Sequence, residues 1–279
     1  MILLNFVALT GSKANGNINP KDSLKDGSIK PIDLYLDGNQ NIVDSKVIAF
    51  EKALEDFTQQ IARKKRKYKR ESKFLEYVFY KTHHKFLKNY VLYSSLGDLI
   101  ENSNYDCVAG TALYALILER LDIDYTIKEF DYHVLLIAKT DSKEFLFEST
   151  DPIDGFVKNK SEINKRIQFY TIPELENGAV QSIGAKEKLN QQSYSVNNDI
   201  NIQQLAGLQF YNMAVKSYNE TDYIQAIQNL EKGIRHYNAN RFQVFLEILL
   251  DNLEDNSTIN TEDINHYLYK YRRRTFAKK

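Results

Sequence analysis

Residues 107–121 have the sequence CVAGTALYALILERL, which is apolar on almost every side of a helix. A helix without a polar face belongs in the centre of a domain, surrounded by other elements. After it the pattern changes to short runs rich in β-branched and aromatic residues, at 125–130, 133–139, 145–148 and 167–172. These runs predict strands, and the turn at 140–143 has the composition of a hairpin loop. The stretch therefore predicts an α+β fold, with helices packed on a small antiparallel sheet.

Two amphipathic helices are predicted before the central one. Apolar residues recur at intervals of three and four within 46–69 and again within 72–90. The first pattern runs into a basic run at 63–70, RKKRKYKR, with seven basic residues in eight. Such a run is typical of the solvated end of a long helix. The alternative is a surface that binds phosphate backbones or anionic lipid.

The composition narrows the classes of function. Among 279 residues, Lys+Arg and Asp+Glu both count 37, so the chain lacks the overall positive charge typical of nucleic-acid binding, and no nucleic-acid partner is expected. The single cysteine excludes an intramolecular disulfide framework and any multi-cysteine metal cluster. His83 and His84 point about 100° apart on a helix and have no third ligand pattern near them, so neither a metal nor a cofactor is expected. No apolar run approaches the roughly 18–20 residues of a membrane span, so no integral membrane segment is expected.

The amino-terminal region is expected to be a flexible lead-in over residues 1–32. Residues 2–9 have the sequence ILLNFVAL, and small residues follow at Ser12 and Ala14. This pattern is similar to the hydrophobic part and cleavage site of a secretory signal peptide, although the usual basic start is missing. It indicates a periplasmic or secreted protein; the alternative is a buried strand of a cytoplasmic one.

The carboxy-terminal part returns to helical patterns. Residues 174–200 are polar and predict a linker between a domain at 33–173 and a helical module at 201–279. Helices are predicted at 202–219, 223–236, 242–253 and 261–269. In the first two, Phe210, Ala214, Tyr223 and Ala226 fall near the packing positions of a tetratricopeptide repeat. The module is predicted either to bind a protein partner or position a substrate, or to cover the core of the first domain.

Three residues suggest nucleophilic chemistry. Cys107 starts the central helix, where unpaired N–H groups and the helix dipole favour a thiolate. His133 opens an apolar strand, and Glu148 ends the next one. If the two strands form a hairpin, the carboxylate reaches the imidazole and orients it as a base for the thiol. Asp151 is the second candidate for the carboxylate. A space-filling cysteine and a structural histidine are the alternatives.

Four motifs together resemble the transglutaminase-like superfamily over roughly residues 70–172. They are Cys107-Val108-Ala109-Gly110, the helix end Leu121-Asp122-Ile123-Asp124-Tyr125, the strand opening with His133, and the strand ending Glu148-Ser149-Thr150.

The resemblance implies a papain-like core and a catalytic set made of Cys107, His133 and either Glu148 or Asp151. It also implies an enzyme that acts on amide or peptide bonds of a peptide or protein through a thioester, as a protease, an amidase or an acyltransferase.

A second interpretation of the chain, without catalysis, is also open. Leu135 and Phe145 stand where the family often has Trp, and the superfamily includes inactive members. The alternative is therefore a non-catalytic scaffold whose tetratricopeptide-like helices bind a protein partner.

Overall fold

The structure is a computed structural model that describes residues 30–36, 43–171, 196–255 and 261–276. The signal-peptide-like stretch at 2–14 and most of the predicted linker at 174–200 lie outside these residues. Ile32, at the end of the predicted lead-in, is buried. Among the described residues, no helix combines the length and apolar character needed to cross a lipid bilayer.

The sheet confirms the predicted α+β class. It has five strands in the order β6-β5-β4-β3-β7, and every neighbouring pair is antiparallel. The strands are β3 (Asp124–Phe130), β4 (Val134–Lys139), β5 (Glu144–Phe147), β6 (Phe156–Val157) and β7 (Asn197–Ile200). The predicted hairpin is confirmed, since β4 pairs with β5 and Leu136 lies opposite Phe147. The edge strand β7 falls inside the segment predicted as a linker.

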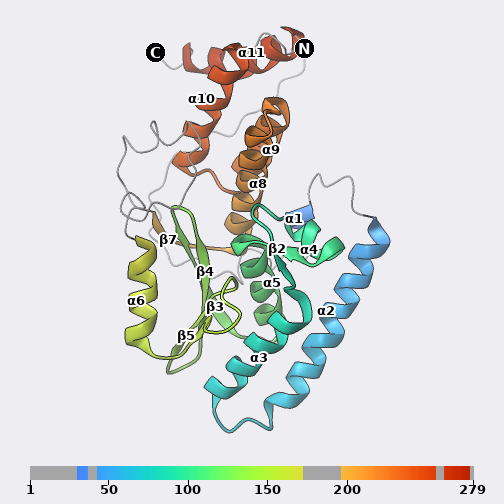
Figure 1. Cartoon of the computed structure of the whole chain (residues 1–279), viewed down its shortest axis with the longest axis vertical. Coiled ribbons are helices and arrows are strands. Elements are labelled where there is room, and N and C mark those ends of the chain that lie inside the picture. Colours follow the sequence, from blue (N-terminus) through green and yellow to red (C-terminus); the bar gives the residue numbers. More distant parts are fainter. Residues whose placement is uncertain (1–29, 37–42, 172–195, 256–260, 277–279) are drawn as a thin grey trace, which may run out of the picture.

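Both faces of the sheet are buried. Along β4, Val134 and Leu136 belong to the cluster around α5 (Cys107–Arg120), whereas Leu135 and Ile137 face α6 (Lys160–Thr171). Figure 1 shows the sheet between these two helices. A strand covered on both faces has no polar alternation, which is why 134–138 is a continuous apolar run.

The strand predicted at 167–172 is wrong, because residues 160–171 form α6. Ile163, Ile167 and Tyr170 recur at intervals of four and three and pack on the second face of the sheet. The helical period begins upstream of residue 167, so the short run by itself shows only its β-type composition.

The predicted amino-terminal helices are confirmed with earlier ends, as α2 (Asp44–Lys65) and α3 (Glu71–Phe86). They form a helical hairpin at one end of the molecule (Figure 1). Helix α3 ends because Leu87 takes an extended backbone. Shorter elements were not predicted: α1 (Asp33–Leu36), α4 (Leu96–Asn102), and the parallel pair of β1 (Asn89–Tyr90) with β2 (Asn104–Tyr105).

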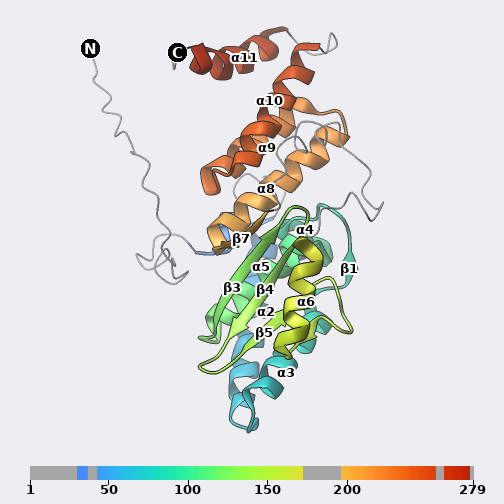
Figure 2. The same cartoon turned by 90° about the vertical axis from the view of Figure 1, so that its left-hand side faces the viewer.

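The four carboxy-terminal helices are present at the predicted places, as α8 (Ile202–Asn219), α9 (Tyr223–His236), α10 (Asn240–Asp255) and α11 (Thr261–Phe276). Helices α8 and α9 pack closely, since a Cβ on Gly233 would lie 3.0 Å from the carbonyl oxygen of Gly207. Helices α10 and α11 extend away from the sheet (Figures 1 and 2).

Helix α8 shares the core of the sheet-containing part. The side chain of Gln209 accepts the Leu96 N–H at 2.7 Å and donates to the Tyr35 carbonyl at 2.8 Å. Tyr35 in turn donates its hydroxyl to the carbonyl of Ile202 at 2.9 Å. Gln209 and Tyr35 are both buried, so these bonds fix α8 against the elements around α5.

Candidate active site

Cys107 is the first residue of α5 and is 9% exposed. The preceding residue, Asp106, caps the helix by accepting the N–H of Ala109 at 2.8 Å. Its second carboxylate oxygen accepts a hydrogen bond from Asn212 of α8 at 3.0 Å. A residue of the carboxy-terminal helices therefore helps to hold the start of the cysteine helix.

Gly110 explains the Cys-x-x-Gly motif in physical terms. A Cβ at this position would lie 2.7 Å from both Cβ and Oγ of Ser149, closer than real Cβ contacts allow. Ser149 follows the end of β5 and is completely buried. The glycine thus lets the end of β5, with Glu148, approach the first turn of α5.

His133 and Glu148 form the closest polar contact of the site. Their Nε2 and Oε2 atoms are 2.6 Å apart, and the glutamate side chain is 1% exposed. The ladder between β4 and β5 ends at Leu136 and Phe147, so both residues lie just beyond it. The predicted hairpin thus brings the imidazole and the carboxylate together.

Three further hydrogen bonds hold the Glu148 carboxylate. Its Oε1 accepts the hydroxyl of Thr150 at 2.8 Å and the N–H of the same residue at 3.2 Å. Its Oε2 accepts the hydroxyl of Tyr170 at 3.2 Å. Burial pushes the pKa of Glu148 up, but the charge of His133 and the hydrogen bonds from His133 and Thr150 outweigh it, so the pKa lies below its ordinary value.

Tyr170 was not among the predicted site residues. Its ring stacks on the imidazole of His133, with centroids 4.2 Å apart and an angle of 22° between the planes. It comes from α6, in the segment predicted as a strand, and no sequence signal places it at the site. Stacking and the bond to Glu148 together limit rotation of the imidazole.

Asp151, the second candidate for the orienting carboxylate, has other partners. It accepts the N–H groups of Ile153 and Asp154 at 3.2 and 2.8 Å and pairs with Arg166 at 3.1 Å. Partial burial opposes the effect of these contacts, which nevertheless lower the pKa of Asp151. The structure therefore brings His133 together with Glu148 and places Asp151 in the following turn.

The thiol of Cys107 lies near the backbone N–H of Val134, at the start of β4, which favours the charged form of the thiol. Burial raises the pKa of Cys107, and the charges of Asp106 and Glu148 raise it further. The N–H groups of Val134 and Val108 lower it by a smaller amount. The expected effect of the helix terminus is thus outweighed by burial, and the resting group is a neutral thiol.

A second histidine lies on the inner face of α3. His83 is buried, and its Nε2 is 3.2 Å from the carbonyl oxygen of Ser149 and 3.3 Å from the hydroxyl of Tyr105. Burial lowers the pKa of His83. Its interval of four from Phe79 places it on the buried stripe of the helix, a signal that was present in the sequence.

Comparisons with known proteins do not indicate a function, so a functional assignment depends on the geometry of these residues. The chain matches no protein-family model, no curated protein and no solved structure. Within the described ranges, no three His, Cys, Asp or Glu side chains are grouped so as to hold a metal ion.

Replacing Asp106 with Asn should make the thiol more reactive. The pKa of Asp106 is raised from 3.8 to about 6 by burial, against the opposing bonds from Ala109 and Asn212, so above pH 6 it is ionised beside Cys107. Removing this charge should lower the pKa of the thiol by about one unit, which corresponds to roughly tenfold faster alkylation near pH 8. The measurement is the rate of reaction with iodoacetamide against pH.

Asn is also a good helix cap, so Asp106→Asn should keep the fold. Because the folded-state pKa of Asp106 is the higher one, its contribution to stability is present below pH 3.8 and lost as the pH rises through about 6. The variant should therefore melt at a higher temperature than the parent above pH 6. Asp151→Asn is the matched control, and equal alkylation rates for the two variants would contradict the electrostatic explanation.

Proposed function

We propose that this protein is a cysteine enzyme of the transglutaminase-like type, with α5 and the sheet as its core. Cys107 is the nucleophile, His133 the base and Glu148 the orienting carboxylate. The observation that carries the proposal is the 2.6 Å contact between His133 and the buried Glu148, with Cys107 near the backbone N–H of the residue after His133. The substrate is an amide or peptide bond in a peptide or protein.

The tautomer of His133 determines how it acts. With Nε2–H donating to Glu148, the lone pair of Nδ1 is left to accept the proton of Cys107. The thiol is neutral at rest, so proton transfer accompanies attack on the carbonyl carbon, when the S–C bond forms. The negative charge moves to the carbonyl oxygen, where N–H groups at the start of α5 stabilise it.

The second half of the reaction returns the proton. His133 protonates the departing nitrogen as the C–N bond breaks, which leaves a thioester on Cys107. Water or a second amine then attacks the thioester, gives its proton to His133 and displaces the sulfur, which is protonated again. Water makes the protein a hydrolase, and an amine makes it an acyltransferase.

The non-catalytic alternative has one observation in its favour. Cys107 is buried and its pKa is raised, as in a cysteine that fills space. In that reading the sheet and α5 are a scaffold, and the carboxy-terminal helices bind a protein partner. The bond from Asn212 to Asp106 gives α8 a role in holding the cysteine helix in either reading.

A reactive ester tests the proposal without knowledge of the substrate. We expect p-nitrophenyl acetate to acetylate Cys107 and release p-nitrophenolate, with the acetyl group located by mass spectrometry of the intact and digested protein. Cys107→Ala should lose the modification and the release of product, and should keep its melting temperature. Acetylation that spreads over surface lysines and leaves Cys107 unmodified would favour the scaffold.

A further inference from the structure

The helical hairpin of α2 and α3 concentrates positive charge. Residues 60–88 contain eleven Lys and Arg but only two Glu, a formal charge of +9. Because the whole chain has a net charge of zero, the remaining residues carry −9. The basic run at 63–70 supplies most of this charge, and the rest lies on α3 and just after it.

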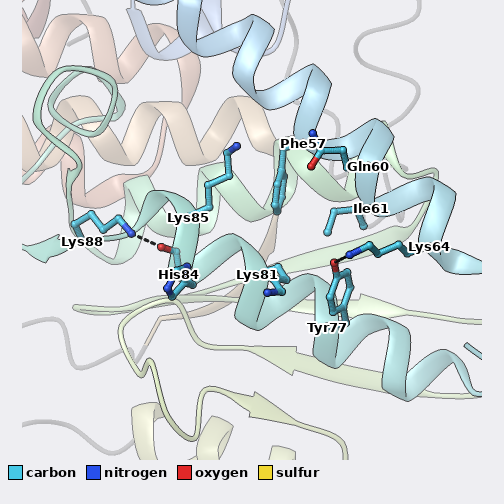
Figure 3. A pocket seen from close by; sticks show the side chains of 9 residues that line it. All are labelled: Phe57, Gln60, Ile61, Lys64, Tyr77, Lys81, His84, Lys85 and Lys88. Carbon is cyan, nitrogen blue, oxygen red and sulfur yellow. Dashed lines mark hydrogen bonds between the residues drawn. The ribbon is translucent and has the colours of Figure 1, made fainter. Parts of the chain in front are cut away.

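A groove of about 430 Å³ lies between the two helices. This volume falls within the range of small-molecule sites, about 300–1,000 Å³. Lys64 of α2 and Lys81, Lys85 and Lys88 on or just after α3 line the groove (Figure 3). None of the described residues that line it carries a carboxylate.

The lysines from α3 form a row. Lys81 and Lys85 are four residues apart, so they lie on one face of α3, and Lys88 follows just after the helix ends at Phe86. Helical neighbours at an interval of four are about 5–6 Å apart at Cβ. A row of ammonium groups along one wall matches a chain of linked anionic groups better than it matches a single ion.

The charges of these lysines are not neutralised within the part of the chain that the structure describes. Lys64 donates to the hydroxyl of Tyr77 at 2.9 Å, and Lys88 donates to the carbonyl of His84. Neither acceptor carries a full negative charge. Elsewhere, exposed lysines do pair with carboxylates, as Lys73 does with Glu76 at 2.6 Å. Like charges gathered without counter-charges attract an anion.

Aromatic rings lie beneath the ammonium groups. The Nζ atom of Lys85 is 5.5 Å from the centre of the Phe57 ring, and that of Lys64 is 5.3 Å from the centre of the Tyr77 ring. These contacts hold the lysine stems along apolar surface and leave the charges at the rim. Phe57 belongs to the buried core, whereas the half-buried ring of Tyr77 offers a surface for the organic part of a ligand.

We propose that this groove binds a linear polyphosphate chain, either free or attached to a nucleoside. The lysine row supplies point charges for successive phosphates, which is how lysine recognises phosphate. A groove between two helices admits a narrow chain, whereas a membrane or a nucleic-acid duplex would contact the exposed run at 63–70. The proposal is independent of the candidate active site, because His83, on the buried face of α3, is the residue that contacts Ser149.

Calorimetric titration of the full chain with inorganic tripolyphosphate and with adenosine triphosphate tests the proposal. The groove variant is Lys81→Gln with Lys85→Gln, two exposed positions where Gln keeps the helix. The matched control, Lys67→Gln with Lys69→Gln, removes the same charge from the basic run outside the groove. We expect the groove variant to weaken binding by at least about tenfold and the control by less than about threefold.

The two probes distinguish the sources of the phosphate chain. Equal affinity for both indicates recognition of the chain alone, and tighter binding of adenosine triphosphate indicates that the nucleoside rests on the Tyr77 ring. Two results would overturn the proposal: neither probe binds at low ionic strength, or both variants weaken binding equally. A third result would also overturn it: the protein binds phosphatidylglycerol vesicles or single-stranded DNA but binds neither probe. The basic residues would then form a surface for a membrane or a nucleic acid.

Discussion

Glu148→Gln should lower the rate of Cys107 acylation by about a thousandfold or more. The Gln amide can donate to Nε2 of His133, which stabilises the tautomer with its proton on Nδ1. In the proposed mechanism, that tautomer has no lone pair on Nδ1 to accept the proton of the thiol, so the base is lost although the side chain keeps its shape. Release of p-nitrophenolate under single-turnover conditions measures the effect.

Asp151→Asn is the control that decides between the two predicted carboxylates. Asp151 pairs with Arg166 rather than with His133, so its neutral variant should keep the rate within about threefold of the parent. Unchanged melting temperatures for both variants would exclude unfolding as the cause. A thousandfold loss for Asp151→Asn and a small one for Glu148→Gln would reverse the assignment.

Glu129→Gln should destabilise the protein by about 3 kcal/mol, or lower the melting temperature by roughly 6–9 °C. Glu129 of β3 is 1% exposed and pairs with Arg241 of α10. It also accepts the hydroxyl of Tyr237 at 2.6 Å and the amide of Asn198 at 3.3 Å. The neutral variant leaves the guanidinium with little counter-charge in a mostly buried place. Urea unfolding followed by circular dichroism measures the loss.

Asp199→Asn is the matched control for this prediction. Asp199 pairs with Lys128, the neighbour of Glu129 on β3, but it is 54% exposed. Its loss should cost no more than about 0.5 kcal/mol. Combining Glu129→Gln with Arg241→Gln should recover much of the stability, since both charges are then removed. Equal losses for Glu129→Gln and Asp199→Asn would show that burial of the pair does not matter.

The elements that sequence reasoning predicted correctly are those with a strong local period. The central helix, the two amphipathic helices and the four carboxy-terminal ones each have enough residues to show a helical face. The edge strand β7 was missed because three of its four residues are exposed and it has no apolar alternation. The strands β1 and β2 have two residues each, which is too few to carry any period.

The residues of the candidate site also fall into two groups, those predicted from local sequence and those that were not. His133 and Glu148 were found because a hairpin between their strands places residues near its open end side by side. Tyr170 and Asn212 were not found, because they reach the site from helices that are distant in the chain. Contacts of that kind depend on how the layers pack, and a local pattern holds no information about them.

Local sequence patterns alone predicted the α+β class, the burial of α5 and the pairing of the strands that bear His133 and Glu148. The apolar period and the hairpin geometry are properties of residues that are close in the chain, so they can be recognised from the sequence without the folded structure. The folded structure was needed to see that burial raises the pKa of the Cys107 thiol, and that lysines of α2 and α3 face one groove. Electrostatic effects depend on distance and on exclusion of water, and packing between separate elements sets both.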